Sequence, residues 1–246
     1  MRSGNPVLSN DTFIQFGRTF NRDNTMTMNG TAAKTCLLLL LTFLTAGWTW
    51  FSYLKGNTAF VSGAMWVGII GGMITAFITI FKMHWAPLTA PIYALLEGLF
   101  LGGISVIFNE QYPGIAIQAI SLTFAVMALM LFLYISRIIQ VTDSLRMGIV
   151  AATGGVALVY FVAIILGFFG VQVPFIFENG LFGILFSLVV VGIAAMNLVL
   201  DFDFIDRGSK SGAPKFMEWY GAFALMVTLV WLYIEILRLL SKLRSR

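Results

Sequence analysis

The sequence predicts an all-α integral membrane protein, a bundle of seven transmembrane helices, and two observations support this fold class. First, 59% of the 246 residues are hydrophobic and 11% are charged. Soluble domains are about 45–50% apolar and about 25% charged, so this chain has too few polar side chains to cover a water-facing surface. Second, the apolar residues form seven runs, each close to the roughly 20 residues that a helix needs to cross a bilayer.

The seven predicted spans follow one another with short connections. They cover residues 35–54, 60–81, 87–108, 115–135, 148–170, 180–200 and 219–240. They end at charged or turn-forming residues, such as Lys55-Gly56-Asn57, Pro113-Gly114 and Pro174. Short connections favour antiparallel neighbours and leave no room for a soluble domain within the transmembrane domain, residues 34–243.

The two remaining polar stretches are the N-terminal segment and the longest connection. Residues 1–33 are rich in Asn, Thr, Ser and Gly, and we expect a flexible tail there. The longest connection runs from Asp201 to Glu218, and its Asp206-Arg207-Gly208 triplet is interpreted as loop.

The distribution of basic residues predicts the orientation of the chain. With seven crossings, ten Lys and Arg residues lie on the side of the N-terminus and five on the opposite side. The five are Lys55, Arg238, Lys242, Arg244 and Arg246. Because basic residues are more frequent on the cytoplasmic side, we expect the N-terminus to be cytoplasmic. The net charge of +4 is explained by this flanking role, so no nucleic-acid partner is expected.

Small residues recur in three spans at a spacing that lets helix backbones approach each other in lipid. These residues are Gly68, Gly71, Gly72 and Thr75 in the second span, Gly98 and Gly102 in the third, and Ala151 and Gly155 in the fifth. We interpret these faces as helix-packing surfaces, with a role in lining a pore as the alternative.

The sequence offers little for enzymatic chemistry or cofactor binding. A single cysteine, Cys36, excludes an internal disulfide, and a single histidine, His84, excludes a histidine-cluster metal site built by one chain. His84 lies beside Trp85 in a short connection and is expected at the membrane interface. We therefore expect no enzymatic activity and no cofactor, apart from Ca²⁺ as a transported or bound ion.

Ionisable residues inside a bilayer are costly and mark functional sites. Glu97 lies ten residues into the third span, where a neutral, hydrogen-bonded acid is favoured. It either bonds a neighbouring helix or takes part in proton or cation handling. Glu235 and Arg238, three residues apart on the last helix, can form an ion pair on one face. That pair is either a simple stabilising pair or part of a functional site.

Three aspartates follow the sixth apolar run. Asn197 and Asp201 are four residues apart and share one face of the helix, whereas Asp203 and Asp206 share another. Asp206 is expected in loop and Asp203 is ambiguous. Asp201 follows three apolar residues directly and has Asn197 one turn deeper, so it is the strongest candidate for a functional carboxylate.

At these residues the chain resembles the transmembrane Bax inhibitor motif family, and more closely its bacterial YccA-like branch. The resemblance rests on Leu-Val-Leu-Asp-Phe-Asp-Phe-Ile (198–205), on Thr-Leu-Val-Trp-Leu-Tyr-Ile-Glu-Ile-Leu-Arg-Leu-Leu (228–240) and on Glu-Gly-Leu-Phe-Leu-Gly (97–102). It covers roughly residues 30–243. The family implies a seven-helix fold whose last helix is central, and localisation to the bacterial cytoplasmic membrane.

The resemblance also implies a pH-sensitive calcium leak, in which an Asp at the end of the sixth helix pairs with an Asp of the seventh. Two such carboxylates share a proton and form a titratable latch. Asp201 matches the first acid, whereas Thr228 occupies the position of the second. A hydroxyl can hydrogen-bond Asp201 but cannot share its titration. A calcium site would therefore have to recruit Asp203, Glu97 or backbone carbonyls, because Ca²⁺ prefers six to eight oxygens.

Two functions remain open from the sequence. One is a pH-modulated cation (calcium) leak with Asp201 as proton sensor and Thr228, Asn197, Asp203 and Glu97 along the ion path. The other is a non-conducting membrane regulator that binds membrane proteases or stress-response proteins through its tail and the 201–218 connection. The lipid bilayer is the expected partner in both, and the oligomeric state is left open.

Overall fold

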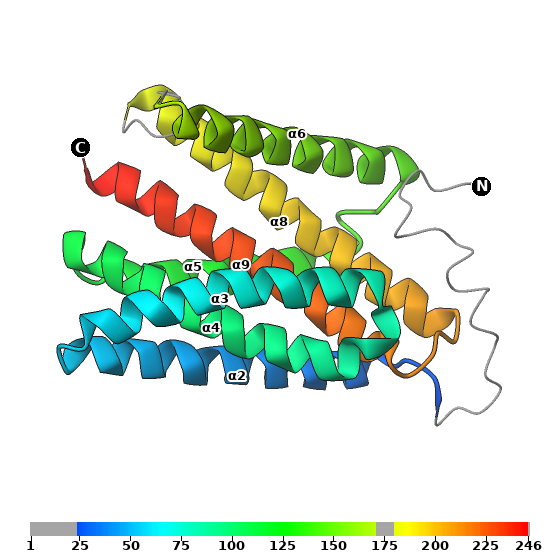
Figure 1. The fold of residues 1–246 in the computed structure, drawn as a ribbon. Coiled ribbons are helices and arrows are strands. Elements are labelled where there is room, and N and C mark those ends of the chain that lie inside the picture. The colour runs from blue at the N-terminus through cyan, green and yellow to red at the C-terminus, as the bar shows by residue number, and fades with distance from the viewer. Residues whose placement is uncertain (1–23, 171–179, 246) are drawn as a thin grey trace. The chain divides into compact units, whose positions relative to one another are not determined.

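The computed structural model describes residues 24–170 and 180–245, which form seven long helices (Figure 1). They are α2 (Met28–Leu54), α3 (Thr58–Phe81), α4 (Ala86–Gln111), α5 (Ile115–Ile135), α6 (Asp143–Phe168), α8 (Leu181–Lys210) and α9 (Met217–Arg244). A short 3₁₀ helix, η2 (Met83–Trp85), precedes α4. Each long helix is apolar and long enough to cross a membrane. The predicted all-α, seven-helix membrane class is confirmed.

Several helices extend beyond the predicted spans. α2 begins at Met28, inside the segment predicted as tail, because the Thr27 side chain caps it by accepting a bond from the Gly30 N–H at 3.0 Å. Residues 1–23 of the predicted tail lie outside the described residues, so the division into tail and transmembrane domain stays a prediction. The interpretation of Asp206-Arg207-Gly208 as loop is wrong: α8 continues to Lys210, and Gly212 follows it with φ +71°.

The last helix is the most buried of the seven. In its most apolar stretch, 61% of the residues are buried, against 17–39% in the other six helices. Those six expose large apolar side chains, for example Phe81 (80%), Phe168 (86%) and Phe182 (79%). In water such surfaces would be unstable, whereas in a bilayer lipid tails cover them.

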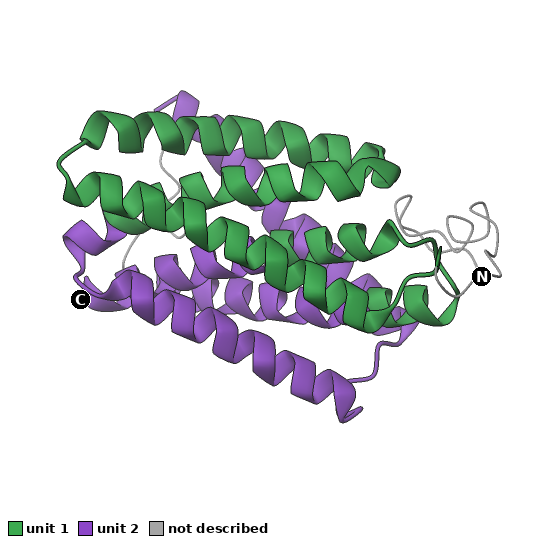
Figure 2. Ribbon diagram, turned by 90° about the horizontal axis from the view of Figure 1, so that it is seen from below, with its two compact units in different colours: residues 1–106, 203–227 green, residues 107–202, 228–246 purple. Residues whose placement is uncertain are grey.

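By internal contacts the chain divides into two compact units (Figure 2). Unit 1 consists of Met1–Val106 and Asp203–Val227, and unit 2 of Ile107–Phe202 and Thr228–Arg246. Both α8 and α9 therefore contribute one part to each unit. Each unit is described by itself below.

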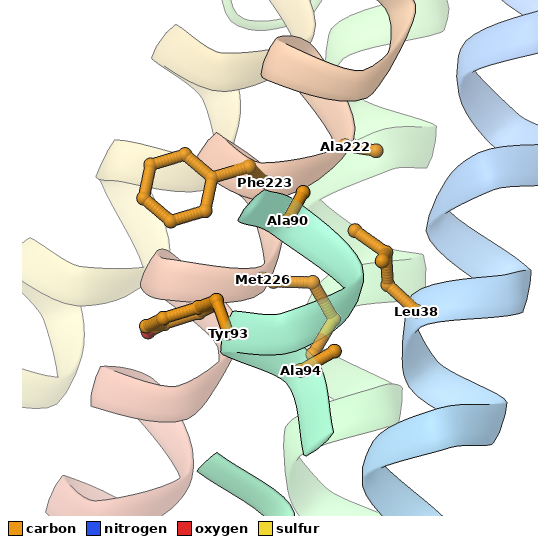
Figure 3. Close-up of a cluster of buried hydrophobic side chains, with 7 residues drawn as sticks. All are labelled: Leu38, Ala90, Tyr93, Ala94, Ala222, Phe223 and Met226. Carbon is orange, nitrogen blue, oxygen red and sulfur yellow. The ribbon is translucent and has the colours of Figure 1, made fainter. Parts of the chain in front are cut away.

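Unit 1 is built around a buried apolar cluster of Leu38, Ala90, Tyr93, Ala94, Ala222, Phe223 and Met226 (Figure 3). The cluster joins α2, α4 and the first half of α9. The rings of Tyr93 and Phe223 meet edge to face with centroids 5.0 Å apart, a favourable aromatic geometry. Small alanines on α4 and α9 let these helices pack closely around the larger side chains.

Glycines bring the helices of unit 1 into backbone contact. A Cβ atom at Gly102 would lie 2.7 Å from the Ala46 carbonyl oxygen, and one at Gly68 would lie 2.6 Å from the Leu96 carbonyl oxygen. Any larger residue would force the helices apart. The corresponding expectation for Ala151 and Gly155 is wrong, since nothing described lies within 4 Å of a Cβ at Gly155.

Candidate functional site

Asp201 and Thr228 form a hydrogen bond between α8 and α9. The Thr228 hydroxyl donates to Asp201 Oδ2 at 2.6 Å, and Thr228 is 8% exposed. Both residues belong to unit 2. This O–H···O distance is typical of a hydroxyl bonded to a charged carboxylate. We call this pair the α8–α9 latch.

Thr228 differs from several threonines of α2. Thr31, Thr35 and Thr49 each donate to the carbonyl four residues earlier in their own helix. That local bond satisfies a hydroxyl without any second helix. Thr228 instead donates a hydrogen bond to a carboxylate on another helix. Its side chain is therefore committed to Asp201, and the strength of this bond depends on the charge of that carboxylate.

A second polar contact lies one turn deeper on α8. Asn197 Nδ2 donates to the Thr153 hydroxyl at 2.8 Å and to the Ile193 carbonyl at 2.9 Å. Thr153 is on α6, so this contact joins α6 to α8. Asn197 and Asp201 share a helix face, as the sequence predicts, and their polar partners come from different neighbouring helices.

The predicted Glu235–Arg238 pair is part of a three-residue cluster that includes Tyr160 of α6. The Tyr160 hydroxyl lies 2.9 and 3.1 Å from the two Glu235 carboxylate oxygens. Arg238 Nη1 donates to the Tyr160 hydroxyl at 2.5 Å and lies 3.3 Å from each carboxylate oxygen. Glu235 is 1% exposed, so its charge is balanced inside the protein rather than by water.

Lys242, one of the five basic residues predicted on the side opposite the N-terminus, lies buried near the end of α9. It is 3% exposed and donates to the Gly183 carbonyl at 3.0 Å and to the Ser187 hydroxyl at 2.9 Å. Beyond it, Arg244 donates to the Pro113 carbonyl and to Gln118 at the α4–α5 turn. The C-terminal end of α9 is thus fixed at that turn, as expected for a last helix that crosses the membrane.

These contacts recur along α6, α8 and α9 in unit 2, and together we call them the polar seam. On α9, Thr228, Glu235 and Lys242 follow one another at seven-residue intervals, which keeps them on one face of the helix. On α6, Thr153 and Tyr160 are also seven residues apart. Each of these side chains bonds a residue of a facing helix. The seam therefore runs along α6, α8 and α9 through a part of the chain that is otherwise apolar.

The other two aspartates do not join the latch. Asp203 pairs with Arg207 at 2.8 Å, and Asp206 pairs with Lys210 at 2.6 Å, each with the residue one turn later in α8. Pairs at this spacing stabilise the helix that carries them. The possible recruitment of Asp203 to a calcium site finds no support in this geometry.

Glu97 lies in unit 1, against α3. A Cβ atom at Gly72 would lie 2.9 Å from Glu97 Oε1, so the carboxyl group packs on the backbone of that helix. Tyr93, one turn earlier on α4, interacts with it. Its Oε2 atom is buried and has no hydrogen-bond partner among the described residues. A role for Glu97 in the ion path stays a prediction.

Sequence reasoning missed one fully buried carboxylate, Glu218. Its four donors are the Thr27 N–H at 2.9 Å, the Thr27 hydroxyl at 2.8 Å, Lys215 at 3.2 Å and Lys34. The preceding residues pair with the same region: the Met26 N–H donates to the Ala213 carbonyl at 2.7 Å. In unit 1, Glu218 therefore fixes the start of α2 to the start of α9.

The described residues contain no group of three or more His, Cys, Asp or Glu side chains that could hold a metal ion. His84 contacts the Trp85 ring edge to face, with the ring centroids 6.0 Å apart. Asp201 brings one carboxylate to the latch. In the described part of the chain, the latch thus combines one titratable carboxyl group with one hydroxyl group.

Comparisons with known proteins identify the family. A search of curated proteins and a search of solved structures returned no match. The family model described as "Bax inhibitor 1 like" matches residues 5–245, nearly the whole chain. Its match agrees with the seven apolar helices and the buried last helix. This chain belongs to the Bax inhibitor 1-like family of seven-span membrane proteins.

Proposed function

We propose that this protein is a pH-modulated cation leak, with calcium as the cation, and that Asp201 is its proton sensor. The observation that carries the proposal is the Thr228–Asp201 hydrogen bond, in which one titratable group joins two membrane-spanning helices. Asn197 and the rest of the polar seam provide a route for ions along α6, α8 and α9. Protons and cations are the substrates, and no resident metal is required.

The direction of the pH effect follows from the chemistry of the bond. An ionised Asp201 accepts a charge-assisted bond from Thr228, which is roughly twice as strong as a bond between neutral groups. Protonation weakens the latch, so α9 separates more readily from α8. The leak therefore increases as the pH falls. Thr228 cannot share the proton, so a single carboxyl group titrates and the pH dependence is shallow.

The proposed orientation has the N-terminal segment and the 211–216 connection on the cytoplasmic side of a bacterial inner membrane. The excess of basic residues on that side supports it. The basic residues on the opposite side weaken this argument for the orientation less than their number suggests. Arg238 pairs with Glu235, Lys242 is buried and Arg244 bonds the α4–α5 turn, so these charges have protein partners.

The test is calcium flux into liposomes that contain the purified protein, measured at several pH values between about 5 and 8. The wild type is expected to leak faster as the pH falls. Asp201→Asn cannot ionise and is expected to leak at the fast rate at every pH. If the wild type carries no calcium at any pH, the leak is refuted, and if Asp201→Asn keeps the wild-type profile, the sensor is refuted.

A second candidate function is a non-conducting regulator of membrane proteases or stress-response proteins. The single carboxylate at the latch favours it, since the family's acid pair is incomplete in this chain. The pairing of the segment before α2 with residues 213–215 gives this end of unit 1 an ordered surface for a partner. Absence of flux in the liposome test would leave this function as the better explanation.

A further inference from the structure

The connection between α8 and α9 is short and lies entirely in unit 1. α8 ends at Lys210 and α9 begins at Met217, so residues 211–216 join the two helices. Gly212, with φ +71°, provides the left-handed turn that follows α8. Movements between two helices are absorbed by a few residues of this kind at the helix ends. We therefore call residues 211–216 the hinge.

Residues 24–27, which precede α2 and which we call the N-terminal strap, are bonded across the hinge. The Met26 N–H donates to the Ala213 carbonyl at 2.7 Å. In the opposite direction, the Lys215 N–H donates to the Asn24 carbonyl at 3.0 Å. The strap and the hinge belong to the same unit. Backbone atoms on both sides of the hinge centre are thus held by a segment far away in the sequence.

The two bonds flank a pair of facing residues, Thr25 and Pro214, which form an isolated antiparallel bridge. A pair flanked in this way exchanges no backbone hydrogen bond of its own. Proline lacks an N–H group, so Pro214 loses no bond by lying at this position. The sequence of the hinge is therefore compatible with strand-like pairing to the strap.

The side chain of Met26 anchors the strap between the two helices. It is 2% exposed. A Cβ atom at Gly221 of α9 would lie 3.4 Å from Met26 Cε and 3.0 Å from Ile205 Cγ1 of α8. The methionine therefore packs where the end of α8 and the start of α9 approach each other, and the glycine leaves the space for it.

Glu218, in the first turn of α9, anchors the strap through polar contacts. The Thr27 N–H and hydroxyl both donate to its Oε1 atom, at 2.9 and 2.8 Å. A Cβ atom at Gly30 would overlap this carboxylate, so glycine is required at that position. Asn24 and Thr27 themselves are exposed. The strap is thus a short surface segment with few contacts, a kind of segment that opens locally without unfolding of the core.

We propose that the N-terminal strap is a clamp on the hinge, which limits how far the start of α9 moves from the end of α8 and thereby limits the leak. The inference rests on the proposed leak and adds a second restraint to it. Asp201 sets the pH dependence of the flux, whereas the strap sets the rate that the flux reaches when the latch opens.

The competing explanation is a strap that only stabilises the fold. Under that explanation, weakening the strap lowers the melting temperature without changing the flux through folded molecules. Linking the strap covalently to the hinge raises the melting temperature and also leaves the flux unchanged. Under the clamp proposal, the covalent link slows the leak and a weakened strap accelerates it.

The first experiment closes the strap with a disulfide. Thr25→Cys and Pro214→Cys are combined with Cys36→Ser, which removes the native thiol. The Cα atoms of such a flanked antiparallel pair are about 4.5 Å apart, a separation that a disulfide can span. In acid, the oxidised protein is expected to carry calcium into liposomes roughly tenfold more slowly than the wild type, as when a barrier rises by about 1.4 kcal/mol. Reduction is expected to restore the rate, and each single-cysteine variant treated with the same oxidant is the control.

The second experiment weakens the strap with Thr27→Val. It removes the hydroxyl that bonds Glu218, and calcium flux at neutral pH is expected to rise several-fold while its pH dependence persists. Thr35→Val is the matched control, because the buried Thr35 hydroxyl bonds only within α2, at the Thr31 carbonyl. Its flux is expected to match the wild type. Melting in detergent is measured for both variants to establish that they are folded.

The outcomes separate the clamp from the leak and from the proton sensor. A wild type with pH-dependent flux beside an oxidised double-cysteine protein with the same flux overturns the clamp alone. A slowed oxidised protein beside an Asp201→Asn variant with the wild-type pH profile supports the clamp and overturns the sensor. No flux from the wild type or from Thr27→Val overturns the clamp together with the leak.

If the double-cysteine protein does not fold, Thr27→Val decides the question. A rate above that of Thr35→Val supports the clamp, and an equal rate overturns it.

Discussion

Two carboxylates, the buried Glu218 in unit 1 and the partly buried Asp201 in unit 2, lie in environments that favour different roles for the same chemical group. Glu218 accepts bonds from four donors, two of them lysine ammonium groups. Asp201 accepts one bond, from a neutral hydroxyl, and no cationic side chain of the described residues pairs with it. A saturated carboxylate stays charged and fixes helices together, whereas a sparsely bonded one can exchange a proton. The comparison makes Glu218 an anchor and supports the proposal that Asp201 is a switch.

The largest expected effect is on stability and comes from Glu218→Gln. The substitution leaves Lys34 and Lys215 without their common partner and weakens the contact with Thr27. Breaking a buried pair costs about 3 kcal/mol, so the melting temperature in detergent is expected to fall by roughly 10 °C. The pH dependence of calcium flux is expected to persist in the molecules that remain folded. A variant that melts like the wild type would contradict the anchor role.

Thr228→Val is expected to have the next largest effect. It removes the hydroxyl that bonds Asp201 and preserves the size of the side chain. Loss of a hydrogen bond to a charged group costs about 2 kcal/mol, so melting is expected to occur roughly 6 °C lower. Because the latch is lost, calcium flux at neutral pH is expected to rise toward the rate that the wild type reaches in acid. Unchanged flux at neutral pH would show that the bond does not restrain α9.

Asp203→Asn is expected to have the smallest effect and serves as the matched control for Asp201→Asn. Asp203 lies two residues later on the same helix and pairs with Arg207, half of whose side chain is exposed. Asp203 itself is 7% exposed, so the loss of its charge is expected to cost about 1 kcal/mol and to lower the melting temperature by roughly 3 °C. The pH profile of flux is expected to match the wild type. A flattened pH profile of flux in Asp203→Asn would show that proton sensing is not specific to Asp201 and involves the neighbouring aspartate of α8 as well.

Much of the fold could be predicted from the sequence because a bilayer imposes a strict local rule. Every span has to be a long apolar helix, and the seven runs are visible without knowledge of distant contacts. The helix ends were less predictable. The pairs formed by Asp203 and Asp206 with Arg207 and Lys210 support helix where charged residues suggested loop.

The polar contacts depend on residues far apart in the chain. The pairing of Thr228 with Asp201 was accessible because the family pattern aligns the two helices. Glu218 was missed because its partners Thr27 and Lys34 are 191 and 184 residues away. Tyr160 is 75 residues from Glu235, and no local signal marks it as a partner. The burial of Lys242 could not be predicted because its partners, Gly183 and Ser187, lie far away in the sequence, on α8.

The most direct test of Asp201 as the proton sensor is pH-difference infrared spectroscopy of the protein in lipid. This method detects carboxyl groups as they take up protons. The wild type is expected to show a protonated carboxyl band that grows as the pH falls. The band is expected to disappear in Asp201→Asn, to shift in Thr228→Val and to persist in Asp203→Asn and Glu97→Gln. A band that is unchanged in Asp201→Asn would contradict the assignment of Asp201 as the proton sensor.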